Sequence, residues 1–232
     1  IGFIYTSTNS SSGNSIIAVA RKIDGSLEEL RSSPYPTGST GDAAEGDFDT
    51  EWALRIVGDY LLAVNAGNNP VNGSISVFKI NRDNGKLTQV EQNPSTPQMD
   101  NIDSRGVRPT TIAVSTSSEK TWIVVGNQFA NPNYQGDPPV AFGSVMNSYL
   151  RNLAVFTFNK STVNLDFAKF GAVYNAGIQG RPTTAVFNSS GTKFAVSTWS
   201  VAHFLSPDPD ISFPTPGRLY FYAFAFGHLV NQ

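Results

Sequence analysis

An alternation of apolar and polar residues, followed by a short polar turn and a second apolar run, occurs four times along the chain. Alternation with a period of two is typical of a β-strand, and a Gly- or Asn-containing turn between two such runs predicts a β-hairpin. The turns IDGSL, NRDNGKL and FGHL place glycine where a tight turn needs a positive φ, and Asn164 is expected to take this place in the third copy. The four predicted hairpins are Ile17–Leu27, Ile75–Leu87, Leu153–Leu165 and Leu219–Leu229.

A second repeat precedes two of these hairpins. The sequence RPTT occurs at Arg108–Thr111 and again at Arg181–Thr184, and the same offset continues into the strands TWIVV and FAVST. Joining the two repeats gives a unit of four strands, lettered a to d in chain order. The first unit supplies only strands b, c and d, full units follow at about 51–93 and 110–175, and strand d of the fourth unit begins near the end of the sequence. The strands of the first unit and that last strand are predicted at Phe3–Asn9, Ser15–Lys22, Leu27–Ser32 and Leu229–Gln232.

These units predict an all-β fold, a β-propeller of four-stranded antiparallel blades. Strands that are apolar on both faces, such as Leu219–Phe226, indicate sheets buried on both sides, which a radial stack of blades provides. The propeller is expected to be incomplete, with about three and a half blades and about fourteen strands in one domain, 1–232. An unclosed array leaves two apolar faces in water. The approximate blades are 1–37, 50–96, 109–176 and 182–232.

Composition narrows the classes of function. Charged residues make up 15% of the chain, the formal net charge is −2, and no run of Lys or Arg occurs, so we expect neither nucleic acid nor a membrane as partner. With no cysteine there is no disulfide, thiolate nucleophile or Cys-ligated metal, and we expect no metal or cofactor. Four N-x-Ser/Thr sequons, which also arise by chance in a chain rich in Asn, Ser and Thr, favour a secreted, extracellular glycoprotein. The sequons begin at Asn9, Asn72, Asn159 and Asn188.

The segments FIYTSTN…IIAVARKIDGSLEEL and YLLAVNAG…GSISVFKINRDNGKLTQV resemble the seven-bladed lactonase-type propellers. This family includes 6-phosphogluconolactonases and 3-carboxymuconate cyclases, and the chain is similar more narrowly to their secreted fungal relatives. The resemblance implies that strand a of the first blade comes from the far C-terminus. We therefore expect either about half of a longer propeller or closure by a second copy in a homodimer.

A functional site is expected at the mouth of the channel, where the d-to-a and b-to-c loops gather. Arg108 and Arg181, each before a Pro that opens an inner strand, are predicted to hold a carboxylate or phosphate there. The alternative is that each arginine binds backbone carbonyls of its own loop. Further ligand contacts are predicted for Trp199, which could stack on a sugar ring, and for Asn65 and Asn127.

Catalytic candidates lie in two loops. Asp47 and Asp49 belong to the acidic segment 42–51, and His203 lies in the loop 200–217, where it could act as a base. For the acidic segment the alternatives are a solvated loop, ion pairs with Arg108 or Arg181, and a hard cation. For His203 the alternative is a surface histidine. His228 is expected in a turn between strands c and d, away from the mouth. The aromatic residues expected to pack between blades are Trp52, Trp122, Phe187, Tyr220, Tyr222 and Phe224.

Two functions follow from these residues. The resemblance implies a lactonase-like hydrolase or cycloisomerase-like enzyme that binds a small anionic sugar lactone or a muconate-type acid. Lactonase-type enzymes commonly have a histidine after the Pro that opens an inner strand, whereas this chain has Thr110 and Thr183. This departure favours the alternative, a non-catalytic secreted binding or surface glycoprotein that uses the mouth and the long loops.

Overall fold

The structure is a computed structural model that describes residues 2–41, 52–67, 72–93, 100–116, 120–128, 152–174, 181–199 and 217–231, with only the backbone for Val173 and Trp199. Every regular element in these residues is a β-strand, and the strands form four antiparallel sheets. No helix in these ranges is long and apolar enough to cross a membrane. The predicted all-β class is confirmed.

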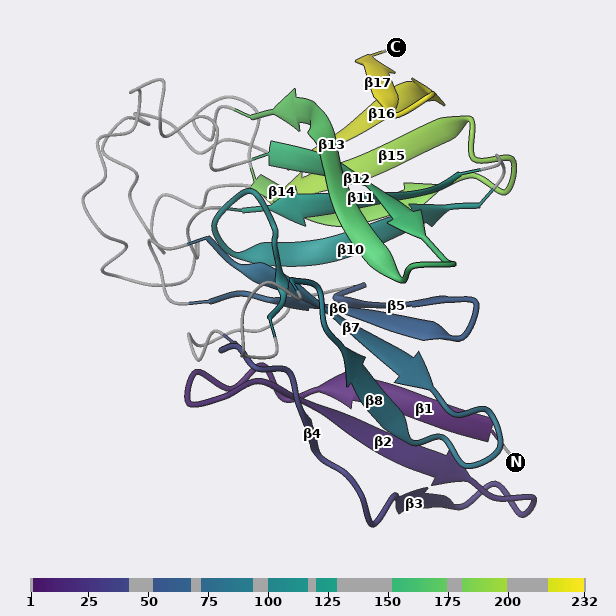
Figure 1. Ribbon diagram of the computed structural model, residues 1–232. Helices are drawn as coiled ribbons and strands as arrows, with labels where there is room; N and C mark the ends of the chain where they lie inside the picture. Colours follow the sequence, from purple (N-terminus) through teal and green to yellow (C-terminus); the bar gives the residue numbers. More distant parts are fainter. Residues whose placement is uncertain are drawn as a thin grey trace.

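Each sheet is one blade, and Figure 1 shows the four blades fanned in chain order from the purple N-terminal blade to the yellow C-terminal blade. Blade A contains β1 (Gly2–Ser7), β2 (Ser15–Arg21), β3 (Leu27–Glu29) and β4 (Tyr35–Pro36). Blade B contains β5 (Leu54–Val57), β6 (Tyr60–Asn65), β7 (Ser74–Ile80), β8 (Leu87–Val90) and β9 (Ile102–Asp103). Blade C contains β10 (Pro109–Ser115), β11 (Thr121–Asn127), β12 (Asn152–Asn159) and β13 (Asn164–Val173). Blade D contains β14 (Arg181–Phe187), β15 (Lys193–Trp199), β16 (Arg218–Ala225) and β17 (His228–Asn231).

The outer strand is divided in the first two blades. Both β3 and β4 pair with β2, and both β8 and β9 pair with β7. The chain therefore returns to the blade edge twice, and this division is the main reason that the described strands number 17 rather than about fourteen. Blade A begins with strand b, as predicted, because β1 pairs with β2 and no described strand lies on its inner side.

The hairpin turns follow the predicted glycine chemistry with one exception. Glycine has a positive φ in the three predicted turns, at Gly25, Gly85 and Gly227. In the turn between β12 and β13 the residue with positive φ is Val163, at 59°. The prediction for Asn164 was wrong, because Asn164 is already the first residue of β13 and pairs with Asn159.

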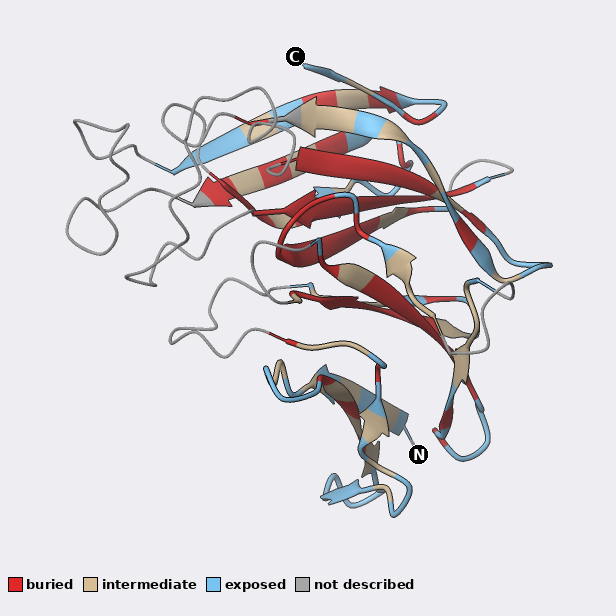
Figure 2. Cartoon of the chain, turned by 60° about the vertical axis from the view of Figure 1, so that its left-hand side comes forward, coloured by how far each residue is buried: buried red, intermediate tan, exposed pale blue. Residues whose placement is uncertain are grey.

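Three apolar cores lie between successive blades, and β11 shows how the sequence produces them. Ile123 and Val125 pack in the core shared with blade B, whereas Trp122 and Val124 pack in the core shared with blade D. Successive side chains of a strand point to opposite faces, so the run TWIVV covers both faces of blade C. Figure 2 shows the consequence, with the middle blades mostly buried and the two end blades much less so.

Most of the predicted aromatic residues pack between blades C and D. The rings of Trp122 and Phe224 meet edge to face with centroids 5.9 Å apart, and Phe187, Tyr220 and Tyr222 belong to the same core. The prediction for one further aromatic residue was wrong.

That residue is Trp52, which is half exposed and lies in a turn before β5. Its φ of 65° places it outside the extended alternation of the strand, so its side chain does not enter the blade interface. The Arg55 guanidinium instead lies 3.6 Å from the centre of its ring.

The two end blades each expose an apolar face. On blade D, Leu219, Phe221 and Val230 are more than half exposed, since Tyr222 and Phe224 on the other face pack on blade C. On blade A, Ile4 is 47% exposed and Leu27 is 61% exposed. The predicted incomplete propeller with two uncovered apolar faces is therefore observed.

Candidate functional site

The two RPTT segments lie side by side at one end of the blades. Strand β10 runs against β14 of the next blade. The Thr110 hydroxyl donates a hydrogen bond to the Pro182 carbonyl at 3.3 Å, and the Ala185 N–H donates to the Thr111 hydroxyl oxygen at 3.2 Å. The repeat therefore brings equivalent segments of two blades into contact.

Arg108 and Arg181 are both buried at this end, with 2% and 1% of their surface exposed. Each immediately precedes the proline of its segment, and the contact between Thr110 and Pro182 makes the two positions neighbours. Burying a charged side chain is costly unless charged or polar groups compensate it. The structure thus places the two predicted arginines beside the beginnings of adjacent inner strands, Arg108 just before β10 and Arg181 as the first residue of β14.

Gln128 belongs to the same site, and sequence reasoning missed it. It follows β11, its N–H donates to the Arg108 carbonyl at 3.0 Å, and its side chain is fully buried. Within the described parts of the chain, neither atom of its side-chain amide has a hydrogen-bond partner. The repeat contains a signal for it: the residue after strand b is the polar Gln128 in blade C, whereas the equivalent residue in blade B, after β6, is the apolar Ala66.

Thr110 and Thr183, which follow the prolines of the two RPTT segments, are engaged in the fold. Besides the bond from Thr110 to Pro182, the Thr183 and Ser197 hydroxyls are hydrogen-bonded at 2.7 Å. Both threonines are buried. Neither hydroxyl titrates near neutral pH, so these positions supply no general base.

Asn65 and Asn127 end strand b of blades B and C, and their amides join neighbouring segments. Asn65 donates to the hydroxyls of Ser74 and Ser76 at 3.1 and 2.9 Å and accepts a bond from Asn14 of blade A at 2.8 Å. These bonds give Asn65 a structural role between blades A and B.

The Asn127 amide nitrogen donates to the Ser104 carbonyl at 3.0 Å and to the Asn152 side-chain oxygen at 2.9 Å. These bonds hold the segment before β10 against the end of β11 and the start of β12. The ligand contacts predicted for Asn65 and Asn127 stay predictions.

The other predicted site residues are placed only in part. Trp199 ends β15 and is the cross-strand partner of Arg181, so its backbone is at the site. His203, Asp47 and Asp49 lie outside the described residues, and their roles stay predictions. His228 begins β17, where its Nε2 atom lies 2.7 Å from Lys169 Nζ.

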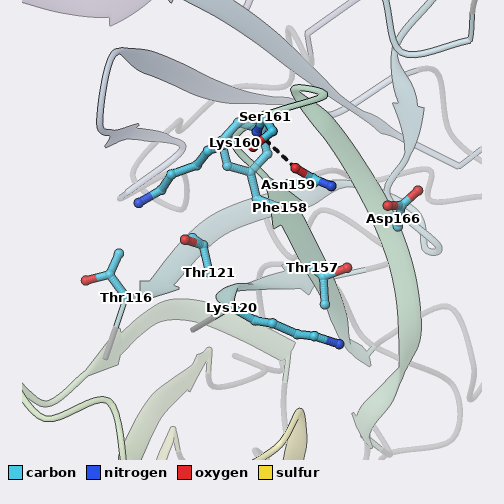
Figure 3. Close-up of a pocket in the computed structure, with 9 residues that line it drawn as sticks. All are labelled: Thr116, Lys120, Thr121, Thr157, Phe158, Asn159, Lys160, Ser161 and Asp166. Atoms are coloured by element: carbon cyan, nitrogen blue, oxygen red, sulfur yellow. Dashed lines mark hydrogen bonds between the residues drawn. The ribbon is translucent and has the colours of Figure 1, made fainter. Parts of the chain in front are cut away.

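A surface cavity of about 460 Å³ lies at the opposite end of blade C, beside the turn between β12 and β13. Lys120 and Lys160 both line it, but in Figure 3 their side chains extend in opposite directions. Most of its lining residues are exposed, while Thr121 and Phe158 are buried. This cavity is separate from the arginine site, and its two cations do not converge.

Comparison with protein-family models finds no match, and comparison with curated protein sequences finds none either. Solved structures do match. A putative 6-phosphogluconolactonase from Bacteroides uniformis matches with 13% identity and a TM-score of 0.52, over 99% of this chain and 52% of its own. A protein from Lactobacillus plantarum matches with 12% identity and a TM-score of 0.57, over 99% and 53%.

The periplasmic gluconolactonase of Pseudomonas aeruginosa also matches, with 16% identity and a TM-score of 0.50, over 99% of this chain and 66% of its own. At these identities the likeness concerns the fold, which is a β-propeller of the lactonase type. The chain spans about half the length of the first two of these structures.

Proposed function

We propose that this protein binds a small organic anion of the sugar-acid or sugar-lactone type between blades C and D. The observation that supports the proposal most strongly is the burial of Arg108 and Arg181 at neighbouring positions of adjacent inner strands. A planar guanidinium matches a carboxylate or phosphate with two parallel hydrogen bonds. Two such groups beside one buried amide, that of Gln128, form a site for a ligand with charge and further polar groups.

Lactonase-like or cycloisomerase-like turnover is the finer part of the proposal. Two of the solved structures with this fold are called a putative 6-phosphogluconolactonase and a gluconolactonase. On this chain a proton acceptor for such a reaction would come from His203, Asp47 or Asp49. Trp199 would stack on the sugar ring.

The second candidate is a binding protein without catalysis. Thr110 and Thr183 favour it, because their hydroxyls already bond within and between the blades and cannot move a proton at neutral pH. We also propose an extracellular location, which the four sequons support; Asn72, Asn159 and Asn188 are exposed. A further blade, from a longer chain or a second copy, would cover the open faces of blades A and D.

Isothermal titration of 6-phosphogluconate and gluconate into the protein tests the proposal. A hydrogen bond to a charged group contributes about 1.5–3 kcal/mol, so Arg181→Gln and Arg108→Gln should each weaken binding roughly 10- to 150-fold. Arg82→Gln is the charge-matched control, because Arg82 pairs with Asp59 at the exposed surface. Circular dichroism confirms that each variant is folded.

Failure of the wild-type chain to bind any of these anions, or equal affinity in wild type and both site variants, would overturn the proposal. Hydrolysis of δ-gluconolactone by the wild-type chain, lost in Arg181→Gln, would select the enzyme. Binding with no turnover would select the non-catalytic protein.

A further inference from the structure

The side-chain amide of Gln128 is the most unusual polar group in the described residues. It is fully buried, and neither its oxygen nor its nitrogen has a hydrogen-bond partner in the described parts of the chain. Buried side-chain amides are almost always hydrogen-bonded, because a buried donor or acceptor without a partner lowers the stability of the fold. A group of this kind calls for a partner that the described residues do not provide.

The backbone places Gln128 at the arginine site. Pro109 pairs with Asn127, and the next pair in this antiparallel register is Arg108 with Gln128, joined by the 3.0 Å bond between their main chains. Gln128 and Arg108 are therefore close neighbours.

The alternation of side chains along β11 indicates which face of blade C carries Gln128. A Cβ atom on Gly126 would lie 3.2 Å from the Cβ atom of Pro182 in blade D. Gln128 lies two residues further along the chain, one residue past the end of β11, and continuing the alternation assigns it to the same face. Pro182 directly follows Arg181, so the backbone of Arg181 lies at this end of blade D.

We propose that Gln128 determines the specificity of the anion site by selecting ligands with a hydroxyl group beside the charged group. This inference rests on the proposed function. An amide presents an N–H donor and a C=O acceptor, and a carboxylate or phosphate can satisfy only the donor. The amide oxygen needs a ligand that also donates a hydrogen bond, and a hydroxyl group does both.

The consequence is discrimination between hydroxy acids and plain acids of equal charge. A ligand such as hexanoate has the charge for the arginines but leaves the oxygen of the Gln128 amide without a donor. A site that hydrogen-bonds a ligand hydroxyl discriminates strongly against the analogue that lacks it, because its own polar groups then stay unpaired. Wild-type protein should therefore bind gluconate more tightly than hexanoate.

The test measures the dissociation constants of gluconate and hexanoate for wild type, Gln128→Met and Gln92→Met. Methionine keeps the unbranched shape of glutamine without the amide. We expect Gln128→Met to weaken gluconate binding about tenfold or more, while the affinity for hexanoate changes by less than about twofold. Without ligand, this variant should melt at or above the wild-type temperature, because it removes an unsatisfied buried amide.

Gln92→Met is the matched control. The Gln92 amide donates to the carbonyl of Val163, just before β13, and accepts from the N–H of Leu165 in β13, each at 3.1 Å. This variant should lose thermal stability and keep the wild-type discrimination.

An unchanged ratio of the two affinities in Gln128→Met, or an equal loss for both ligands, would overturn the role of Gln128 while leaving the anion site intact. Wild-type protein that binds neither ligand would overturn the proposed function itself, and the specificity role with it.

Discussion

Replacing Gly73 by alanine tests the packing that positions Arg108. Gly73 precedes β7, its N–H donates to the Gly106 carbonyl, and its carbonyl accepts the Ser104 N–H, each at 3.0 Å. A Cβ atom there would overlap Cδ of Pro109 and lie 2.5 Å from the carbonyl oxygen of Asn65. Both obstacles are rigid, since one is a proline ring and the other is backbone, so the seam between blades B and C has to open.

The magnitude follows from two opposing contributions. Overpacking of this kind costs about 1–3 kcal/mol, and we take the upper end because two rigid groups are in the way. Replacing glycine by alanine lowers the entropy of the unfolded chain, which returns about 0.4–1 kcal/mol. The net loss of about 2 kcal/mol corresponds to a fall in the melting temperature of roughly 4–8 °C for a chain of this size.

Differential scanning fluorimetry of Gly73→Ala and Gly2→Ala measures this effect. Gly2 is the control, because a Cβ atom there has no neighbour within 4 Å among the described residues. Gly2→Ala should melt within about 1 °C of wild type or slightly above it. Equal melting temperatures for Gly73→Ala and wild type would refute the close approach of blades B and C at this point.

Two further outcomes are expected. The hydroxyls of Tyr174 and Tyr222 are hydrogen-bonded at 2.8 Å, and burial raises the pKa of both above the ordinary value of 10.0. The unfolded chain therefore loses these protons at a lower pH than the folded chain, so the free energy of unfolding falls as the pH rises above 10. Urea unfolding at increasing pH should show a loss of stability of up to about 1.4 kcal/mol per pH unit for each tyrosine. The double variant Tyr174→Phe with Tyr222→Phe should show a smaller loss. The same pH dependence in the double variant and in wild type would contradict the burial of these hydroxyls. On the open face of blade D, Phe221→Lys should reduce concentration-dependent self-association of the 232-residue chain without lowering its melting temperature, as light scattering after gel filtration can measure. A wild-type chain that is monomeric at every concentration would show that this face needs no cover.

The blade architecture was predictable because its causes are periodic in the sequence. The alternation in TWIVV assigns its residues to two faces, and the copied RPTT segments set the spacing of two inner strands. The division of the outer strand in blades A and B was not predictable in this way. Short strands such as β4 and β9 have two residues each, too few for any alternation to be recognised.

Candidate site residues could be predicted only where a motif is repeated. Arg108 and Arg181 are candidates because each precedes the same Pro-Thr-Thr, whereas Gln128 is a candidate because it is buried without a partner among the described residues, which is a property of the fold. The positive φ of Val163 has no sequence signal, since β-branched residues rarely adopt it.

We propose that Arg108 and Arg181, which are far apart in the chain, bind one ligand together. A double-mutant cycle with Arg108→Lys, Arg181→Lys and the combined variant, measured by titration of gluconate, tests it directly, because lysine keeps each charge. If both arginines contact the same ligand, we expect a coupling free energy of about 1 kcal/mol or more between the two positions. Losses of affinity that add to within about 0.3 kcal/mol would contradict a shared site.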